Sequence, residues 1–425
     1  GRRAMPPISS TWRARKRRKG RGGGGEESCS EKQDQKVLLS STEDTALQRA
    51  CDIPSDRPKG FSLREDIRLQ RTSEQSPPSC WLSLGVALGA PELFQYVCTY
   101  GFFMLAPNTW DPHQTLLEGP WGRPLPGVFS RPLSIGGSKT VHVKLCFSAS
   151  KWTDEDSSER ELIAFLEESL GEEEVGEVVR QVTRMLRISP EDNRREQEFR
   201  SLFPQAEQDH WFRLFRSPSM FEDACKTITL CNAGWGRTIT MNQLLCEKVS
   251  SCGGFPTPLE LSSWDPEDLK RECGVGYRAA RLISLARRAV ESEELEELEK
   301  LARRCRSPSV GEAQQGELRA KLLALEGFGP YATDNMLMLL GIYNNIAIDS
   351  ETLRHLKSLH GVDEKSAARA VQKVSKIYDR YCPYQFLVYW RELWKDYERL
   401  CGPLHLLPSS RYSMLCANHM KKIRS

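Results

Sequence analysis

Residues 318–356 read LRAKLLALEGFGPYATDNMLMLLGIYNNIAIDSETLRHL, two helical patterns joined by a glycine turn. Apolar residues recur at helical spacing on both sides of the turn Glu326–Gly329, and Pro330 is placed to begin the second helix. The glycines allow a sharp turn and bring backbone N–H groups at a helix start against a phosphate oxygen. The pattern predicts a hairpin that grips a DNA backbone without reading its sequence, with an ordinary αα-hairpin as the alternative. The residues expected on the inner helix faces are Leu318, Leu322, Leu325, Met336, Leu337 and Leu340.

An acidic residue follows this hairpin after one helix and one loop. Asp349 comes directly after the apolar run 346–348 and stands at the start of another helix. Taken alone, it is most simply an N-cap, because aspartate accepts hydrogen bonds from the first amides of a helix. Here the sequence resembles the helix-hairpin-helix DNA glycosylase superfamily, whose members carry an aspartate in this setting. The resemblance implies that Asp349 is catalytic. It also implies that four hairpin residues contact DNA: Gly327, Phe328, Gly329 and Tyr331.

Within that superfamily, the chain is most similar to the 8-oxoguanine glycosylase branch, over roughly residues 154–400 and more weakly in the preceding region. Three segments carry the similarity: SPSMFE at 217–222, CGVGYRAAR at 273–281 and CPY at 382–384. In the family, the tyrosine matching Tyr277 inserts into the duplex where the damaged base has left.

The residues matching Asn232, Arg237 and Arg278 contact the cytosine left opposite the extruded base. Extruding a nucleotide costs a few kcal/mol, which an inserted side chain and new hydrogen bonds offset. The resemblance therefore implies that Asn232, Arg237, Tyr277 and Arg278 bind DNA. A core tyrosine at 277 and a solvated arginine at 278 are the alternatives, and Trp235 is expected on DNA or under the hairpin.

The chain departs from the family at Tyr331. Bifunctional members have a lysine there, whose amine attacks the sugar and then supports strand cleavage. A tyrosine is protonated at neutral pH and forms no imine. The resemblance then implies a monofunctional glycosylase in which Asp349 stabilises the sugar cation and activates a water. A catalytically inactive DNA-binding protein and a glycosylase-lyase using Lys321 or Lys357 are the alternatives.

The base pocket departs from the family as well. The glutamine and phenylalanine that hold the damaged base in the oxoguanine branch fall at Tyr389 and Leu393. Gly101 matches, in a weakly aligned segment, the glycine whose carbonyl reads the oxidised purine. Gly101, Tyr389 and Leu393 are therefore expected to line the base pocket, and the base that is excised stays open.

Composition limits the other classes of function. The chain has 425 residues, of which 39% are apolar and 28% charged, with a formal net charge of +3, as in a globular protein with some disordered sequence. No uninterrupted apolar run is long enough to cross a bilayer.

The 14 cysteines of the chain lack paired spacing, which favours reduced thiols. We expect no metal, since no cysteine–histidine cluster has zinc-ligand spacing, and no cofactor. The expected partner of this monomer is double-stranded DNA containing a damaged base.

The chain divides into four regions by pattern. Residues 1–80 are expected to be a disordered basic tail, 81–153 a small antiparallel sheet domain of β or α+β type, 154–405 a helical glycosylase domain, and 406–425 a C-terminal tail. The fold class is thus mainly α with a small α+β N-terminal part. The basic cluster 13–19 fits a nuclear import signal, with an organellar address, a nucleic-acid tail or a solvated charge run as alternatives.

Local patterns place the first helices of the larger domain. Helical spacing predicts helices from Glu159 onward, first through Leu170 and then over 175–186. Ser217 is expected to cap a helix that stops near Cys231, with Pro218 in its first turn. A glycine-bounded loop at 232–236 then leads into another helix.

Overall fold

The computed structural model describes the chain over residues 60–71, 80–89, 91–116, 122–137, 139–149, 159–204, 213–307 and 312–415. The basic cluster 13–19, most of the expected tail 1–80, and residues 416–425 lie outside these ranges. The compact unit that contains the described residues extends from Pro58 to Ser425. Among the described helices, none combines the length and apolar character needed to span a membrane.

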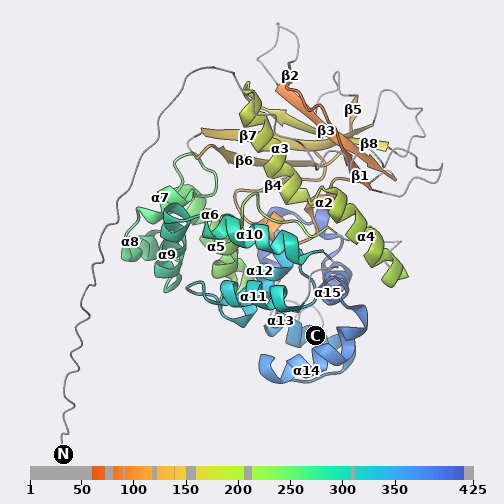
Figure 1. Cartoon of the computed structure of the whole chain (residues 1–425), viewed down its shortest axis with the longest axis vertical. Helices are drawn as coiled ribbons and strands as arrows, with labels where there is room; N and C mark the ends of the chain where they lie inside the picture. The colour runs from red at the N-terminus through yellow and green to blue at the C-terminus, as the bar shows by residue number, and fades with distance from the viewer. Residues whose placement is uncertain are drawn as a thin grey trace, which may run out of the picture. The chain divides into compact units, whose positions relative to one another are not determined.

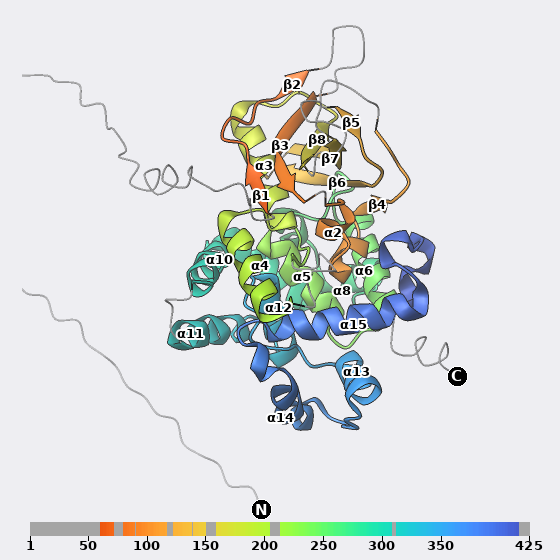
Figure 2. The same cartoon turned by 90° about the vertical axis from the view of Figure 1, so that its right-hand side faces the viewer.

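The first part of the described chain is an eight-stranded antiparallel sheet (Figures 1 and 2). Its main strand order is β1-β3-β8-β7-β6-β4, while β2 pairs with β3 and β5 with β7. The expectation of an antiparallel sheet in this part of the chain is confirmed. The strands are β1 (Phe61–Leu63), β2 (Gln70–Arg71), β3 (Cys80–Leu88), β4 (Thr109–Asp111), β5 (Arg123–Pro124), β6 (Val128–Ile135), β7 (Lys139–Ala149) and β8 (Glu159–Leu166).

Strand β7 has the alternation that the sequence predicts. Val141, Val143 and Leu145 are buried, whereas His142 between them is exposed. Helix α3 (Glu172–Leu186) packs on β6, and its buried valines Val175, Val178 and Val182 lie on one face. The sheet is therefore covered by a helix whose spacing the sequence predicts correctly (Figure 1).

Residues 159–166 form a strand, so the prediction of a helix from Glu159 is wrong for this segment. Strand β8 lies between β3 and β7, and Leu162, Ile163 and Ala164 are all buried. A central strand covered on both faces has a continuous apolar run, which periodicity alone does not separate from a helix. The sheet therefore extends past the boundary expected at residue 153.

The boundary expected at residue 80 is also wrong. Strands β1 and β2 both pair with β3, so residues 61–63 and 70–71 belong to the sheet rather than to a disordered tail. These strands are too short to give a periodic signal of their own. Their pairing depends on β3, which is distant in sequence.

Helices make up most of the remaining chain, as expected. Helix α5 begins at Met220 with Ser219 as its N-cap, so Ser217, predicted as the cap, lies two residues too early. The Ser219 hydroxyl accepts a hydrogen bond from the Glu222 amide, a bond that Ser217 is not placed to make. The helices after α3 are α4 (Pro190–Leu202), α5 (Met220–Leu230), α6 (Trp235–Lys248), α7 (Pro258–Ser262), α8 (Pro266–Cys273), α9 (Arg278–Glu291), α10 (Glu294–Cys305), α11 (Glu312–Leu323), α12 (Pro330–Leu339), α13 (Ser350–His360), α14 (Ala367–Tyr378) and α15 (Gln385–Cys401).

Short helical turns complete the fold. They are α2 (Phe94–Val97), η2 (Gly101–Met104), η4 (Asp379–Tyr381), η5 (Leu404–Leu406) and η6 (Ser409–Met414). The expectation of a tail from residue 406 is wrong for the described part, because η6 packs against α6 and both Tyr412 and Leu415 are buried. Figures 1 and 2 place α13 and α14 at the end away from the sheet.

Candidate active site

The predicted glycine hairpin joins α11 to α12. The inner faces of both helices are buried as expected, and Gly327 in the turn has a φ of 90°. A Cβ atom at Gly327 would lie 2.7 Å from Cδ of Arg281, so both the backbone conformation and the space require glycine. Phe328 is only 6% exposed and packs in the core. Its side chain therefore packs inward, and a DNA contact at Phe328, which stays a prediction, would be made by the backbone of the turn.

The second hairpin glycine is placed to receive an anion. Gly329 is the N-cap of α12 and supplies no side-chain cap, and no side chain among the described residues accepts a hydrogen bond from the first amides of that helix. Such amides have no partner within the helix and carry the positive end of its dipole. A Cβ atom at Gly329 would meet nothing within 4 Å. The backbone is therefore open at this point of the surface.

A cavity of about 350 Å³ lies beside the hairpin. The structure brings together there five residues that the sequence predicts separately. Gly101, Tyr331, Asp349, Tyr389 and Leu393 all line its wall. The wall is rich in aromatic rings: Tyr100, Phe102, Trp235, Tyr331, Phe386, Tyr389, Trp390, Trp394 and Tyr397.

Asp349 is the N-cap of α13 and also part of the cavity wall. Its Oδ1 accepts hydrogen bonds from the Glu351 amide at 3.0 Å, the Thr352 amide at 2.9 Å and the Thr352 hydroxyl at 3.0 Å. Within the described part of the chain, no hydrogen bond is made to Oδ2. One oxygen of the carboxylate thus fixes its orientation, and the other is available.

The surroundings of Asp349 raise its proton affinity. Burial raises the pKa of Asp349, and hydrogen bonds from Thr352 and Glu351 offset this only in part. Burial, followed by the charge of Asp349, raises the pKa of Tyr331 well above its ordinary value. The cavity therefore holds a neutral phenol at position 331, where the sequence resemblance places the lysine of bifunctional glycosylases.

Gly101 and Trp235 are in close contact across the cavity wall. A Cβ atom at Gly101 would lie 3.1 Å from Cη2 of Trp235, so the glycine leaves room for the indole. Among the described groups, none accepts a hydrogen bond from the buried Trp235 Nε1. Trp235, which the sequence left between two locations, thus belongs to the cavity.

Sequence reasoning missed several cavity residues. The sequence gives Glu351 no role, yet it lines the cavity and pairs with Arg354. Burial raises the pKa of Glu351, partly offset by Arg354. Aromatic residues of α15 were missed too, although their spacing gives a signal. Phe386, Trp390, Trp394 and Tyr397 follow one another by three or four residues and so share a helix face.

The four predicted DNA-binding residues outside the hairpin meet at the turn before α9. Tyr277 is 50% exposed, and its hydroxyl accepts a hydrogen bond from Asn232 Nδ2 at 3.1 Å. Arg237 Nη2 donates to the Gly274 carbonyl at 3.1 Å. The exposed ring excludes the alternative of a core tyrosine.

Arg278 is placed differently from the expectation. It is only 3% exposed, and its guanidinium donates to the carbonyl oxygens of Cys231 and Val275. It is thus neither solvated nor available to a base in this structure, because carbonyls at the end of α5 and in the turn before α9 accept from its donors. Arg281, whose role was not predicted, lies 4.7 Å from the Tyr277 ring centroid and against Gly327, so it connects the two glycine turns.

The chain matches no protein-family model and no curated protein sequence. It is similar to the crystal structure of Clostridium acetobutylicum 8-oxoguanine glycosylase/lyase in its apo form, with 16% identity and a TM-score of 0.46, covering 78% of this chain and 98% of that one. It is also similar to the 3-methyladenine DNA glycosylase of Archaeoglobus fulgidus, with 18% identity and a TM-score of 0.48, covering 73% and 96%. Both of these solved structures are DNA glycosylases, the class to which the sequence bears its resemblance.

Proposed function

We propose that this protein is a monofunctional DNA N-glycosylase, which extrudes a damaged base from double-stranded DNA and hydrolyses its N-glycosidic bond. One observation carries the proposal. The carboxylate of Asp349, with a free oxygen, lines an aromatic cavity next to an uncapped glycine hairpin.

The hairpin supplies the grip on the DNA backbone. The open amides at Gly329 and the positive end of the α12 dipole favour a phosphate oxygen. Such a contact positions the duplex without sequence preference. The exposed Tyr277 ring then inserts where the extruded base has left, with Asn232 beside it.

The cavity receives the extruded base. Its volume of about 350 Å³ falls within the range of small-ligand pockets, and its rings provide faces for stacking. The partnerless Trp235 N–H provides a donor to a base acceptor. Since Tyr389 and Leu393 replace the residues of the oxoguanine branch, the pocket takes a base that binds mainly by stacking.

The chemistry requires no covalent enzyme intermediate. As the C1′–N bond breaks, the base leaves with the electron pair and Asp349 stabilises the positive charge that develops on the sugar. A water then forms the C1′–O bond and gives its proton to Asp349 or to solvent. The products are the free base and an intact strand with an abasic site.

Two other functions are alternatives to a monofunctional glycosylase: an inactive DNA-binding protein and a glycosylase-lyase. Asp349 is the N-cap of α13, and this structural role alone would account for an aspartate at position 349. A DNA-binding protein without catalytic activity is therefore one alternative. A lyase that uses Lys321 or Lys357 has less support. Both side chains are largely exposed and paired, with Glu317 and Asp363 respectively, and neither lines the cavity.

A single-turnover assay on a panel of lesion duplexes tests the proposal. Each reaction is divided, and one half is treated with alkali to cleave abasic strands. We expect at least one lesion to give strand breaks only after alkali. Absence of base release from every lesion would favour the inactive binder, and breaks without alkali would favour a lyase.

A further inference from the structure

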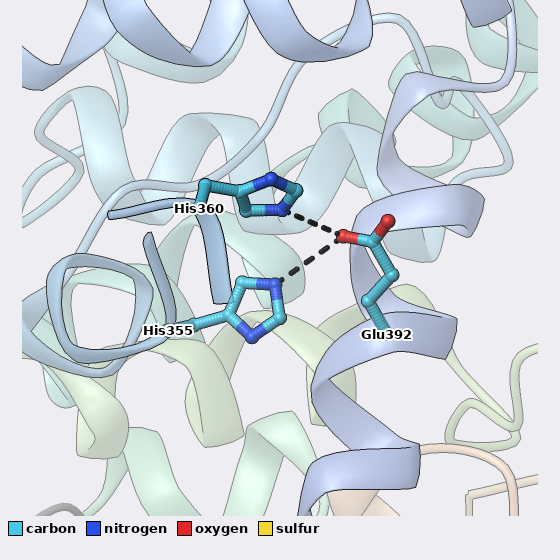
Figure 3. Close-up of side chains that lie close together, drawn as sticks. All are labelled: His355, His360 and Glu392. Atoms are coloured by element: carbon cyan, nitrogen blue, oxygen red, sulfur yellow. Dashed lines mark hydrogen bonds and ion pairs between the residues drawn. The ribbon is translucent and has the colours of Figure 1, made fainter. Parts of the chain in front are cut away.

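A second cluster of polar side chains lies outside the cavity, among α13, α14 and α15. His355 and His360 lie in the second half of α13, Tyr378 ends α14, and Glu392 lies on α15. Nε2 of His355 and Nε2 of His360 lie 3.4 Å and 3.1 Å from the same oxygen, Oε2 of Glu392. Figure 3 shows both imidazoles directed at that oxygen.

The Tyr378 hydroxyl completes the cluster. It donates to Glu392 Oε2 at 2.6 Å and lies 3.0 Å from His360 Nε2 and 3.4 Å from His355 Nε2. Four potential ligand atoms thus surround one point. A tetrahedral zinc ion with ligands at about 2.0 Å separates those ligands by about 3.3 Å, close to the 3.4 Å and 3.1 Å between the two imidazole nitrogens and Glu392 Oε2.

We propose that His355, His360 and Glu392 bind a divalent transition-metal ion, best matched by Zn²⁺, with the Tyr378 hydroxyl facing the fourth coordination position. The three ligand atoms lie within 4.8 Å of one another. Imidazole nitrogen and carboxylate oxygen are ligands that zinc accepts.

Burial encloses part of the cluster, and the side chains of His360 and Glu392 are 21% and 25% exposed. His355 and Tyr378 are each 1% exposed, so the cluster is closed on that side. The three protein ligands come from two helices, α13 and α15, and the fourth position faces the Tyr378 hydroxyl on α14.

The ion would stabilise the helices that form the cavity wall. The His355 and Tyr389 rings lie 5.5 Å apart, and Tyr389 lines the cavity on its other side. The ion would connect α13, which begins after Asp349, to α15, which carries Tyr389. Sequence spacing predicts no metal, because these ligands are spread over residues 355–392 and meet only in the fold.

Zinc binding to the full-length, metal-stripped protein tests the site directly. Competition with a chromophoric chelator should give one tightly bound Zn²⁺ per chain. His360→Ala and Glu392→Gln should each weaken the affinity by more than about 100-fold, since even residues behind the ligands are worth 10–100-fold. His142→Ala, which removes an exposed histidine on β7, is the matched control and should bind as the parent does.

Two further measurements separate this site from chance binding. Co²⁺ at the site should give visible absorption without a thiolate charge-transfer band, whereas ions held by exposed Cys252 or Cys382 would give that band. Zn²⁺ should raise the Tm of the parent and of His142→Ala but not of the other two variants. The proposal is overturned if the parent binds no stoichiometric zinc, if His360→Ala and Glu392→Gln retain it, or if cobalt binds through thiolate. None of these readouts depends on glycosylase activity.

Discussion

The Tyr389 hydroxyl lies 2.9 Å from Oγ1 of Thr352, the same hydroxyl that donates to Asp349 at 3.0 Å. A base-pocket residue on α15 is therefore linked to the candidate catalytic carboxylate on α13 through one side chain. Loss of either contact would leave Asp349 less firmly oriented, because its other hydrogen bonds come only from backbone amides.

Asp349→Asn should abolish base release while the protein keeps its fold and its affinity for DNA. An amide neither neutralises a developing cation nor accepts a proton, so we expect the single-turnover rate to fall by about 100-fold or more. Asparagine is an N-cap as good as aspartate, so the helix should not suffer. An Asn variant that excises at the parent rate, or one that simply unfolds, would contradict the assignment.

The difference in stability between Asp349→Asn and the parent protein should depend on pH. Burial raises the pKa of Asp349 in the folded state, so the folded protein binds this proton more tightly than the unfolded chain does. As pH rises from the ordinary pKa of 3.8 through the raised pKa, ionisation of Asp349 therefore lowers the stability of the parent. Asp349→Asn should therefore be more stable than the parent at neutral pH, with the difference shrinking below the ordinary carboxyl pKa. Urea unfolding at several pH values measures this, and the parent's activity should fall with acid over the same raised window.

Gly329→Ala should weaken binding to damaged and undamaged duplexes alike. The free protein has room for the methyl group, so the loss would come from the approaching phosphate. Gly316→Ala, at an exposed site within α11, is the control and should stabilise the protein by about 0.5–1 kcal/mol without affecting DNA. Fluorescence anisotropy with both duplexes gives the affinities. A loss confined to one lesion would argue against a phosphate contact.

Arg237→Ala, at an exposed position beside Tyr277, should reduce excision opposite cytosine more than opposite adenine, by about tenfold or more in relative rate. A guanidinium matches the acceptor edge of cytosine, and adenine presents a donor instead. Because Arg237 also donates to the Gly274 carbonyl, the variant should lose some stability, so the ratio of the two rates is the informative quantity. Arg287→Ala, exposed on α9, should leave that ratio unchanged. Equal rates opposite both bases in the parent would remove the basis for this role.

Borohydride should trap no covalent adduct between the parent protein and DNA, since Tyr331 offers no amine to the cavity. Tyr331→Lys should recover some trapping, because position 331 lines the same wall as Asp349. Lys321→Ala should change nothing, given that Lys321 is exposed and paired with Glu317. An adduct with the unaltered protein would show that another amine acts as nucleophile.

The sequence predicted correctly the elements that depend on neighbouring residues, and it failed for those that depend on residues far away in the chain. The turn at Gly327 and the inner faces of α11 and α12 follow from nearby residues, and the structure has them where expected. Strand β8 was predicted as a helix because its burial depends on β3 and β7, which lie elsewhere in the sequence. The burial of Arg278 has the same origin, since its acceptor at Cys231 comes from a distant loop.

The cavity was predicted only in outline. Asp349, Tyr389 and Leu393 were placed by resemblance, but nothing near them in sequence indicates that Gly101 meets Trp235. That contact joins η2 to α6, and only the packing of the sheet region on the helices brings the two together. The carboxyl of Glu351 was missed because helix starts commonly carry acids.

The last described residues have a consequence for where the chain can be shortened. Leu404 and Leu415 both line the cavity, and Tyr412 is buried between them in sequence. A fragment cut after α15, at the apparent end of the helical region, would lack one wall of the cavity and expose apolar surface. An expression boundary, a proteolytic cut or a shortened isoform at that point would thus remove the pocket's closing segment while leaving the hairpin and Asp349 in place.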